Sequence, residues 1–132
     1  MKRERKAIGK TYYTWSEMGA DIDVLARRVK RLKKKFSAVW GPARGGLPIA
    51  VCMSHALGIP MAKRPTDPSV LIVDDIADTG RTLNKYAKKG FTIATLFYHK
   101  QCLYVPKVWI REKHDAWVMF PWDAKGREKP NV

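Results

Sequence analysis

Apolar residues first recur at helical spacing in the N-terminal third of the chain. Between residues 16 and 36, apolar positions follow one another every three or four residues, and the basic residues lie between them. The apolar positions are Ile22, Leu25, Val29, Leu32 and Phe36. This pattern predicts an amphipathic helix with a basic outer face. We expect Ser16 or Asp21 to cap its N-terminus.

Two further segments have residues that commonly begin and end helices. Residues 47–58 are mostly apolar, with Pro48 near the start and Gly58 at the end. Proline is tolerated in the first turn and glycine commonly ends a helix, so a helix is predicted there. Residues 79–89 predict a third helix, which Gly90 would close.

Short apolar runs separate these helices and predict strands. They lie at residues 37–41, 69–75 and 91–99, with a brief run at 59–63 and later ones at 107–110 and 115–122. The run at 69–75 is apolar on both faces, which is typical of a strand in a covered parallel sheet. The order of strands and helices predicts an α/β fold with three layers and a mostly parallel central sheet. A length of 132 residues suits one domain over residues 1–132, with loose tails at 1–10 and 124–132.

Composition and charge indicate the cellular compartment of the protein and the charge of its binding partner. Apolar residues make up 45% of the chain, and no run is long enough to span a membrane. Only two cysteines occur, without metal-site spacing, and no secretory signal is recognisable, so a cytoplasmic protein is expected. A net charge of +14 implies an anionic partner. Because no aromatic residue interleaves the basic run 27–35, we favour a solvated helix face there over a nucleic-acid interface.

Acidic residues concentrate where the apolar run at 69–75 ends. Asp74, Asp75 and Asp78 are three of only 12 acids in the chain. One or two carboxylates would suffice to cap the next helix, and adjacent carboxylates after a buried strand repel each other. The first turn of that helix offers backbone N–H groups to an anion, and Thr79 and Thr82 add hydroxyl donors. A phosphate site beside a site for sugar hydroxyls matches a ribose 5-phosphate.

The segment "VLIVDDIADTGRTL" resembles the signature of type I phosphoribosyltransferases, which use phosphoribosyl pyrophosphate (PRPP). The segments "YTWSEM", "ARGGLPIA" and "WVMFPWD" are similar, in order, to the bacterial xanthine-guanine and archaeal hypoxanthine-guanine members. The similarity extends from Tyr12 to Asp123. It implies the fold of that family and transfer of ribose 5-phosphate to a purine base, with hypoxanthine, guanine or xanthine expected.

The resemblance implies a role for each residue of two loops. Asp74 and Asp75 would bind the ribose hydroxyls, and Asp78, beside the purine, would be the catalytic residue that moves a proton and stabilises positive charge. The 5-phosphate would be held by Asp78, Thr79, Gly80, Arg81 and Thr82. Pyrophosphate would be held by Ala43, Arg44, Gly45 and Gly46, with a cis peptide bond at Ala43–Arg44. The alternative for these four residues is a simple glycine-rich turn.

The resemblance also assigns residues to the purine and to Mg²⁺. Lys100, Trp117 and Val118 would bind the purine. Asp123, with Asp74 and Asp75, would help to bind Mg²⁺, whose preferred ligands are carboxylates and phosphate oxygens. For Trp122 we expect packing instead. Family members are commonly dimers or tetramers, so a homo-oligomer is expected.

One segment departs from the family pattern. Residues 59–69 are too few for the strand pair and mobile lid that usually precede the PRPP strand. Without a lid that excludes water, turnover could be slow. A second function therefore stays open, namely a weak or inactive PRPP- or nucleotide-binding module with a regulatory or nucleic-acid-binding role. A pyrimidine acceptor is opposed only by the similarity of the segment 116–123. The sequence does not decide the base.

Overall fold

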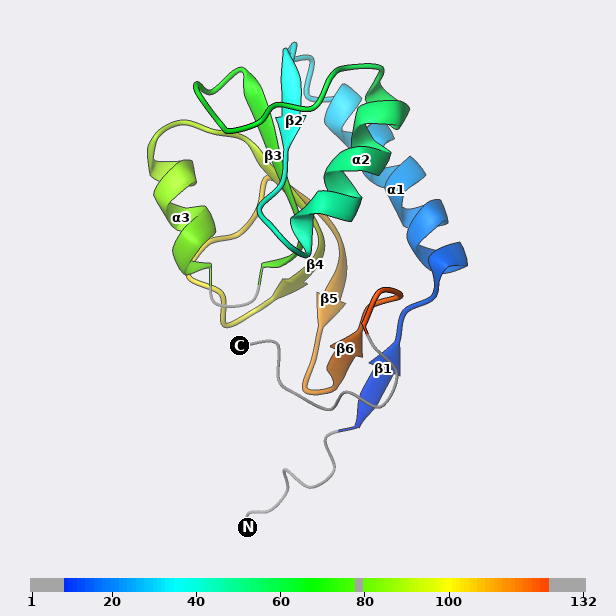
Figure 1. Cartoon of the computed structure of the whole chain (residues 1–132). Helices are drawn as coiled ribbons and strands as arrows, with labels where there is room; N and C mark the ends of the chain where they lie inside the picture. Colours follow the sequence, from blue (N-terminus) through cyan, green and yellow to red (C-terminus); the bar gives the residue numbers. More distant parts are fainter. Residues whose placement is uncertain (1–8, 78–79, 124–132) are drawn as a thin grey trace.

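The sheet at the centre of the protein has four parallel strands in the order β2-β3-β4-β5. A computed structural model describes residues 9–77 and 80–123 (Figure 1). The strands are β2 (Ala38–Trp40), β3 (Val70–Ala77), β4 (Ile93–His99) and β5 (Val108–Lys113). Helices α1 (Trp15–Lys30) and α2 (Gly46–Leu57) cover one face, and α3 (Arg81–Lys88) covers the other (Figure 1). The predicted three-layer α/β fold with a parallel sheet is confirmed.

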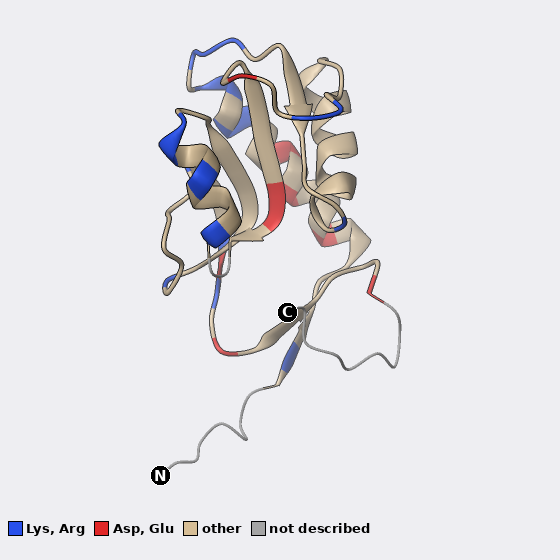
Figure 2. Ribbon diagram, turned by 60° about the vertical axis from the view of Figure 1, so that its left-hand side comes forward, with Lys and Arg blue, Asp and Glu red and all other residues tan. Residues whose placement is uncertain are grey.

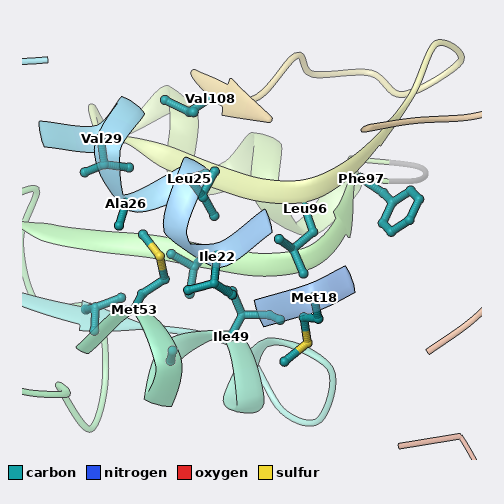
Figure 3. Close-up of a cluster of buried hydrophobic side chains, with 14 of the residues drawn as sticks. Met18, Ile22, Leu25, Ala26, Val29, Ile49, Met53, Leu96, Phe97 and Val108 are labelled. Carbon is teal, nitrogen blue, oxygen red and sulfur yellow. The ribbon is translucent and has the colours of Figure 1, made fainter. Parts of the chain in front are cut away.

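Strand β3 is apolar on both faces because both faces are covered. Leu71 and Val73 are fully buried in the cluster shared with α1 and α2. Val70 and Ile72 lie in a second cluster, with Leu83 of α3. Burying side chains of this size stabilises the fold by roughly 1.5–3 kcal/mol each. The first cluster is drawn in Figure 3, where side chains of α1 meet those of α2 and β4.

Helix α1 begins one residue earlier than its pattern indicates, ends at Lys30 instead of continuing to Phe36, and has a different cap. Thr14 is the N-cap: its Oγ1 accepts from the N–H of Glu17 at 3.0 Å, and the Glu17 carboxylate accepts from the N–H of Thr14 at 2.9 Å. This is a capping box. The expectation that Ser16 or Asp21 caps the helix is therefore wrong. Asp21 is buried and serves a tertiary contact instead.

The N-terminal segment forms a strand that the sequence did not indicate. β1 (Lys10–Tyr12) pairs in parallel with β6 (Trp117–Met119), so Lys10 is not part of the loose tail expected at residues 1–10. Residues 1–8 of that expected tail, and the tail expected at 124–132, lie outside the described residues. The hydroxyl of Tyr13, next to β1, donates to Asp21 Oδ2 at 2.6 Å. Arg111 Nε of β5 donates to the same oxygen at 2.6 Å. This network, in which Tyr13 and Asp21 are buried and Arg111 is partly exposed, ties the β1–β6 pair to α1 and to the central sheet.

One further boundary agrees with expectation and two differ. Helix α2 ends as predicted, with Gly58 in the left-handed conformation at φ 69°. Helix α3 starts at Arg81, after Gly80 at φ 78°. The strand expected at 59–63 is reduced to a single bridge between Met61 and Val39, and the rest of the 58–69 connection is irregular. No helix within the described ranges has the length and apolarity needed to cross a membrane.

Candidate active site

The acidic pair lies inside β3, near its carboxyl end. The strand continues through Asp74 and Asp75 to Ala77 instead of ending at the pair, and Asp74 is aligned with Thr95 of β4. Both carboxylates are only partly exposed. Asp74 Oδ1 accepts from the N–H of Asp75 at 2.8 Å, and Asp75 Oδ1 accepts from the N–H of Ile76 at 2.8 Å. These bonds fix both side chains at the edge of the sheet where parallel sheets bind ligands.

Burial and mutual repulsion make both carboxylates reluctant to ionise. Desolvation raises the pKa of Asp74 well above its usual range, and the charge of Asp75 raises it further. Desolvation also raises the pKa of Asp75, while hydrogen bonds with the Asp74 side chain and with the N–H of Ile76 partly lower it. The charge of Asp123 adds to the rise of the Asp75 pKa. The pair therefore favours a shared proton until a cation or a hydroxyl donor compensates its charge.

The glycine-rich loop after β2 lies directly against this pair. A Cβ added to Gly45 would be 2.1 Å from Asp75 Oδ2, so only a residue without a side chain fits there. The backbones of Gly41 and Gly46 also approach each other closely, since a Cβ on Gly41 would be 2.2 Å from the carbonyl oxygen of Gly46. The Ala43–Arg44 peptide bond is cis, as the resemblance implied. Ala43 and Arg44 are exposed at the open side of the loop. The structure thus brings the two predicted loops together through Gly45 and Asp75.

The loop between β3 and α3 is described only in part. The candidate catalytic residue Asp78 and its neighbour Thr79 lie outside the described residues. Gly80 is buried with φ 78°, a conformation that favours glycine. A Cβ there would be 2.5 Å from Cys102 Sγ, so the segment that begins at Cys102 supports the loop from behind. Arg81 and Thr82 are exposed in the first turn of α3, where backbone N–H groups attract an anion.

The residues predicted to bind the purine are more dispersed. Lys100 follows β4 in a turn, is largely exposed, and has its Nζ 3.7 Å from Glu112 Oε2 of β5. Val118 of β6 is buried in the main core cluster, so its side chain is engaged there and only its backbone is left for a ligand. Trp117 is partly exposed, and its N–H donates to the carbonyl oxygen of Gly9. Trp122 stacks on Phe120 with ring centroids 5.2 Å apart, which confirms its packing role.

The donor set for Mg²⁺ is incomplete within the protein alone. Asp123 accepts a hydrogen bond from the N–H of Phe120 at 2.7 Å. Over residues 9–77 and 80–123, no three His, Cys, Asp or Glu side chains form a ready-made metal site, so the predicted set of Asp74, Asp75 and Asp123 is not preassembled. The pair Asp74–Asp75 still fits a Mg²⁺ ion that takes its other ligands from water and substrate oxygens, which is the usual arrangement for this ion.

Sequence reasoning missed two supporting groups. The segment around Cys102 carries no motif, and only the close approach to Gly80 reveals it. The Tyr13–Asp21–Arg111 network joins residues far apart in the chain, so no local signal identifies it. The cap at Thr14 did have a signal, because a threonine followed three residues later by glutamate is the pattern of a capping box.

Comparison with known proteins bears on the fold of the chain. No family model matches the chain. Among solved structures, a purine phosphoribosyltransferase from Pyrococcus horikoshii is 29% identical, with a TM-score of 0.75 over 92% of this chain and 99% of that one. The Helicobacter pylori xanthine-guanine-hypoxanthine phosphoribosyltransferase is 18% identical, with a TM-score of 0.74 over 86% and 94%. A hypothetical protein from Neisseria gonorrhoeae with bound ppGpp is 20% identical, with a TM-score of 0.71 over 90% and 92%. The chain therefore has the type I phosphoribosyltransferase fold, and the similarity to the purine members that its motifs indicated is confirmed.

Proposed function

We propose that the protein transfers ribose 5-phosphate from PRPP to a purine base, with a 6-oxopurine as acceptor, and releases pyrophosphate with the help of Mg²⁺. The observation that carries the proposal is the contact between Gly45 and Asp75. It joins a loop suited to pyrophosphate to carboxylates suited to ribose hydroxyls. The solved structures that support a purine acceptor are named for purine, xanthine, guanine and hypoxanthine.

Each group of residues has a separate task in this reaction. The hydroxyls of ribose donate to the carboxylates of Asp74 and Asp75, which fixes the sugar against β3. The 5-phosphate accepts hydrogen bonds at the start of α3, near Gly80 and Thr82. Arg44 neutralises the charge that grows on pyrophosphate as the C1–O bond breaks. Bound Mg²⁺ would supply further positive charge at the pyrophosphate oxygens.

Positioning and charge, without a covalent intermediate on the protein, account for the chemistry. The purine nitrogen attacks C1 of the ribose as pyrophosphate leaves, through a state with oxocarbenium character. A carboxylate at position 78 would stabilise that positive charge and accept the proton that the purine loses. Lys100 would donate to the 6-oxo group, in exchange for its present partner Glu112.

The test is product formation across a panel of bases. The protein is incubated with PRPP, Mg²⁺ and one base at a time, namely hypoxanthine, guanine, xanthine or adenine, and nucleoside monophosphate is measured by chromatography. We expect product with at least one 6-oxopurine, and a loss of roughly 10²-fold or more in the Asp78→Asn variant if the group acts as an acid–base catalyst. Product with adenine alone would contradict the proposed acceptor.

A second function has one observation in its favour. The connection 58–69 contains no strand pair that could carry a lid, which favours a module that binds PRPP without efficient turnover. The same panel separates the two functions. Equally little product from the wild type and from Asp78→Asn, with PRPP bound by both, would favour the binding module.

A further inference from the structure

Two long stretches of the chain carry basic residues without any acid. Residues 24–66 contain ten Lys and Arg residues and neither Asp nor Glu. Residues 79–111 contain seven, again without an acid. An ordinary solvated helix face carries both signs of charge, because opposite charges three or four residues apart stabilise it. The separation of charge in this chain therefore needs a tertiary explanation.

The fold brings parts of both stretches to one edge of the sheet. This amino edge is formed by the loops that precede β2, β3, β4 and β5. Lys34 Nζ donates to Thr92 Oγ1 at 3.2 Å, which joins the loop before β2 to the loop before β4. The N–H of Lys107, just before β5, donates to the carbonyl oxygen of Ile93 at 2.9 Å. Six exposed lysines of this edge are Lys33, Lys34, Lys35, Lys88, Lys89 and Lys107, of which Lys88 ends α3 and the others lie in these loops. The loop before β3 adds the exposed side chains of Lys63 and Arg64.

The charge of the amino edge is not neutralised within the described part of the protein. No carboxylate in residues 9–77 or 80–123 forms an ion pair with any of the six lysines. The one acid in these loops, Asp67, accepts from the N–H of Ser69 at 2.9 Å. Hydrogen bonds from Ser69 and Thr66 lower the pKa of Asp67, so it stays ionised at neutral pH as a single negative charge among these eight positive ones. A net positive surface of this kind attracts polyanions.

The amino edge lies at the opposite end of the sheet from the candidate active site. Figure 2 shows blue segments gathered at the top of the molecule and along α3, whereas the red segment of β3 that holds Asp74 and Asp75 is at the other end of the strand. Binding of PRPP at the carboxyl edge therefore does not account for these lysines. The amino edge is a separate basic surface.

We propose that the amino edge binds the phosphate backbone of a double-stranded nucleic acid, without reading its sequence. Lysines grouped on adjacent loops can contact several phosphates of a duplex at once, and lysine binds phosphate as a point charge. The aromatic residues of these loops, Phe36, Phe91 and Tyr104, are partly or fully buried, so the edge offers no exposed ring on which unpaired bases could stack. This feature favours a duplex over a single strand. Three large exposed apolar residues lie in these loops, Met61, Leu103 and Val105, which are too few to insert into a membrane.

The test compares two variants of equal net charge. Lys35→Gln/Lys89→Gln removes two charges from the amino edge, and Lys10→Gln/Lys113→Gln removes two charges from the opposite end of the molecule. Binding of a labelled DNA duplex of arbitrary sequence is followed by fluorescence anisotropy between about 50 and 200 mM salt. Thermal unfolding of both variants verifies that they fold.

The proposal predicts salt-dependent binding by the wild type. In the amino-edge variant, the negative slope of log K against log salt should become shallower by up to about 2, since each phosphate contact contributes about −0.9 to that slope. The control variant should keep the wild-type slope, and saturating PRPP with Mg²⁺ should not displace the duplex. Equal losses in both variants, displacement by PRPP, or binding to vesicles of anionic phospholipid but not to the duplex would each overturn the proposal. None of these outcomes depends on phosphoribosyl transfer.

Discussion

Replacing Gly45 by alanine tests the contact on which the site depends. The backbone of Gly45 has φ −62° and ψ −32°, which alanine adopts without strain. On these grounds alone the change would stabilise the fold by about 0.4–1 kcal/mol. The new methyl group, however, would be 2.1 Å from Oδ2 and 2.6 Å from Cγ of Asp75, well inside van der Waals contact.

The overlap can be relieved only if the loop or the Asp75 carboxylate moves by about 1 Å. Inserting a methyl group into such a closely packed position costs roughly 1–3 kcal/mol. We therefore expect the free energy of unfolding to fall by about 1–2 kcal/mol, since the two effects oppose each other. A displacement of this size at a reacting centre can lower kcat/KM by about 10²-fold.

Gly19→Ala is the matched control for this substitution. Gly19 lies in α1, and a Cβ there would meet nothing within 4 Å. Alanine should stabilise the helix by up to about 1 kcal/mol and leave PRPP binding unchanged. Urea unfolding and PRPP calorimetry on the wild type and both variants measure the effects. If Gly45→Ala binds PRPP as the wild type does, the loop and the acidic pair do not form one site.

Three further predictions concern charge and capping. Burial raises the pKa values of Asp74 and Asp75, so the folded pair holds protons that the unfolded chain releases, and ionisation of the pair destabilises the fold as pH rises through those raised values. Asp74→Asn should therefore stabilise the protein at neutral pH in thermal melts while weakening PRPP binding. A less stable variant would contradict this reasoning. Asp21→Ala leaves Arg111 without its partner and should lower the free energy of unfolding by about 2–3 kcal/mol in urea, whereas a loss below about 0.5 kcal/mol would show that the network is dispensable. Thr14→Ala removes the cap of α1 and should cost about 1 kcal/mol in the same assay, with serine at this position restoring most of it.

The elements that the sequence revealed are those whose burial follows from local pattern. Strand β3 is apolar on both faces because the fold covers both, and Gly58 marks the end of α2 because its backbone is left-handed. Both features leave a signal within a few residues of the sequence, so periodicity and composition reveal them.

The parts that the sequence did not reveal depend on distant partners. Strand β1 has three exposed residues and exists because β6, more than a hundred positions away, pairs with it. Asp21 has the sequence context of a surface helix residue, yet Arg111 and Tyr13 draw it into a buried network. The two halves of the site were recognised separately by their motifs, but the contact of Gly45 with Asp75 is a property of the folded chain.

Isothermal titration calorimetry with PRPP in the presence of Mg²⁺ tests the central claim most directly. The wild type should bind with one site per chain, with affinity that weakens as pH falls because protonation of the raised-pKa carboxylates competes with ribose. Asp75→Asn should bind much more weakly. If the wild type releases no heat with PRPP, with ribose 5-phosphate and with a nucleoside monophosphate alike, the sugar-phosphate site at the end of β3 does not exist.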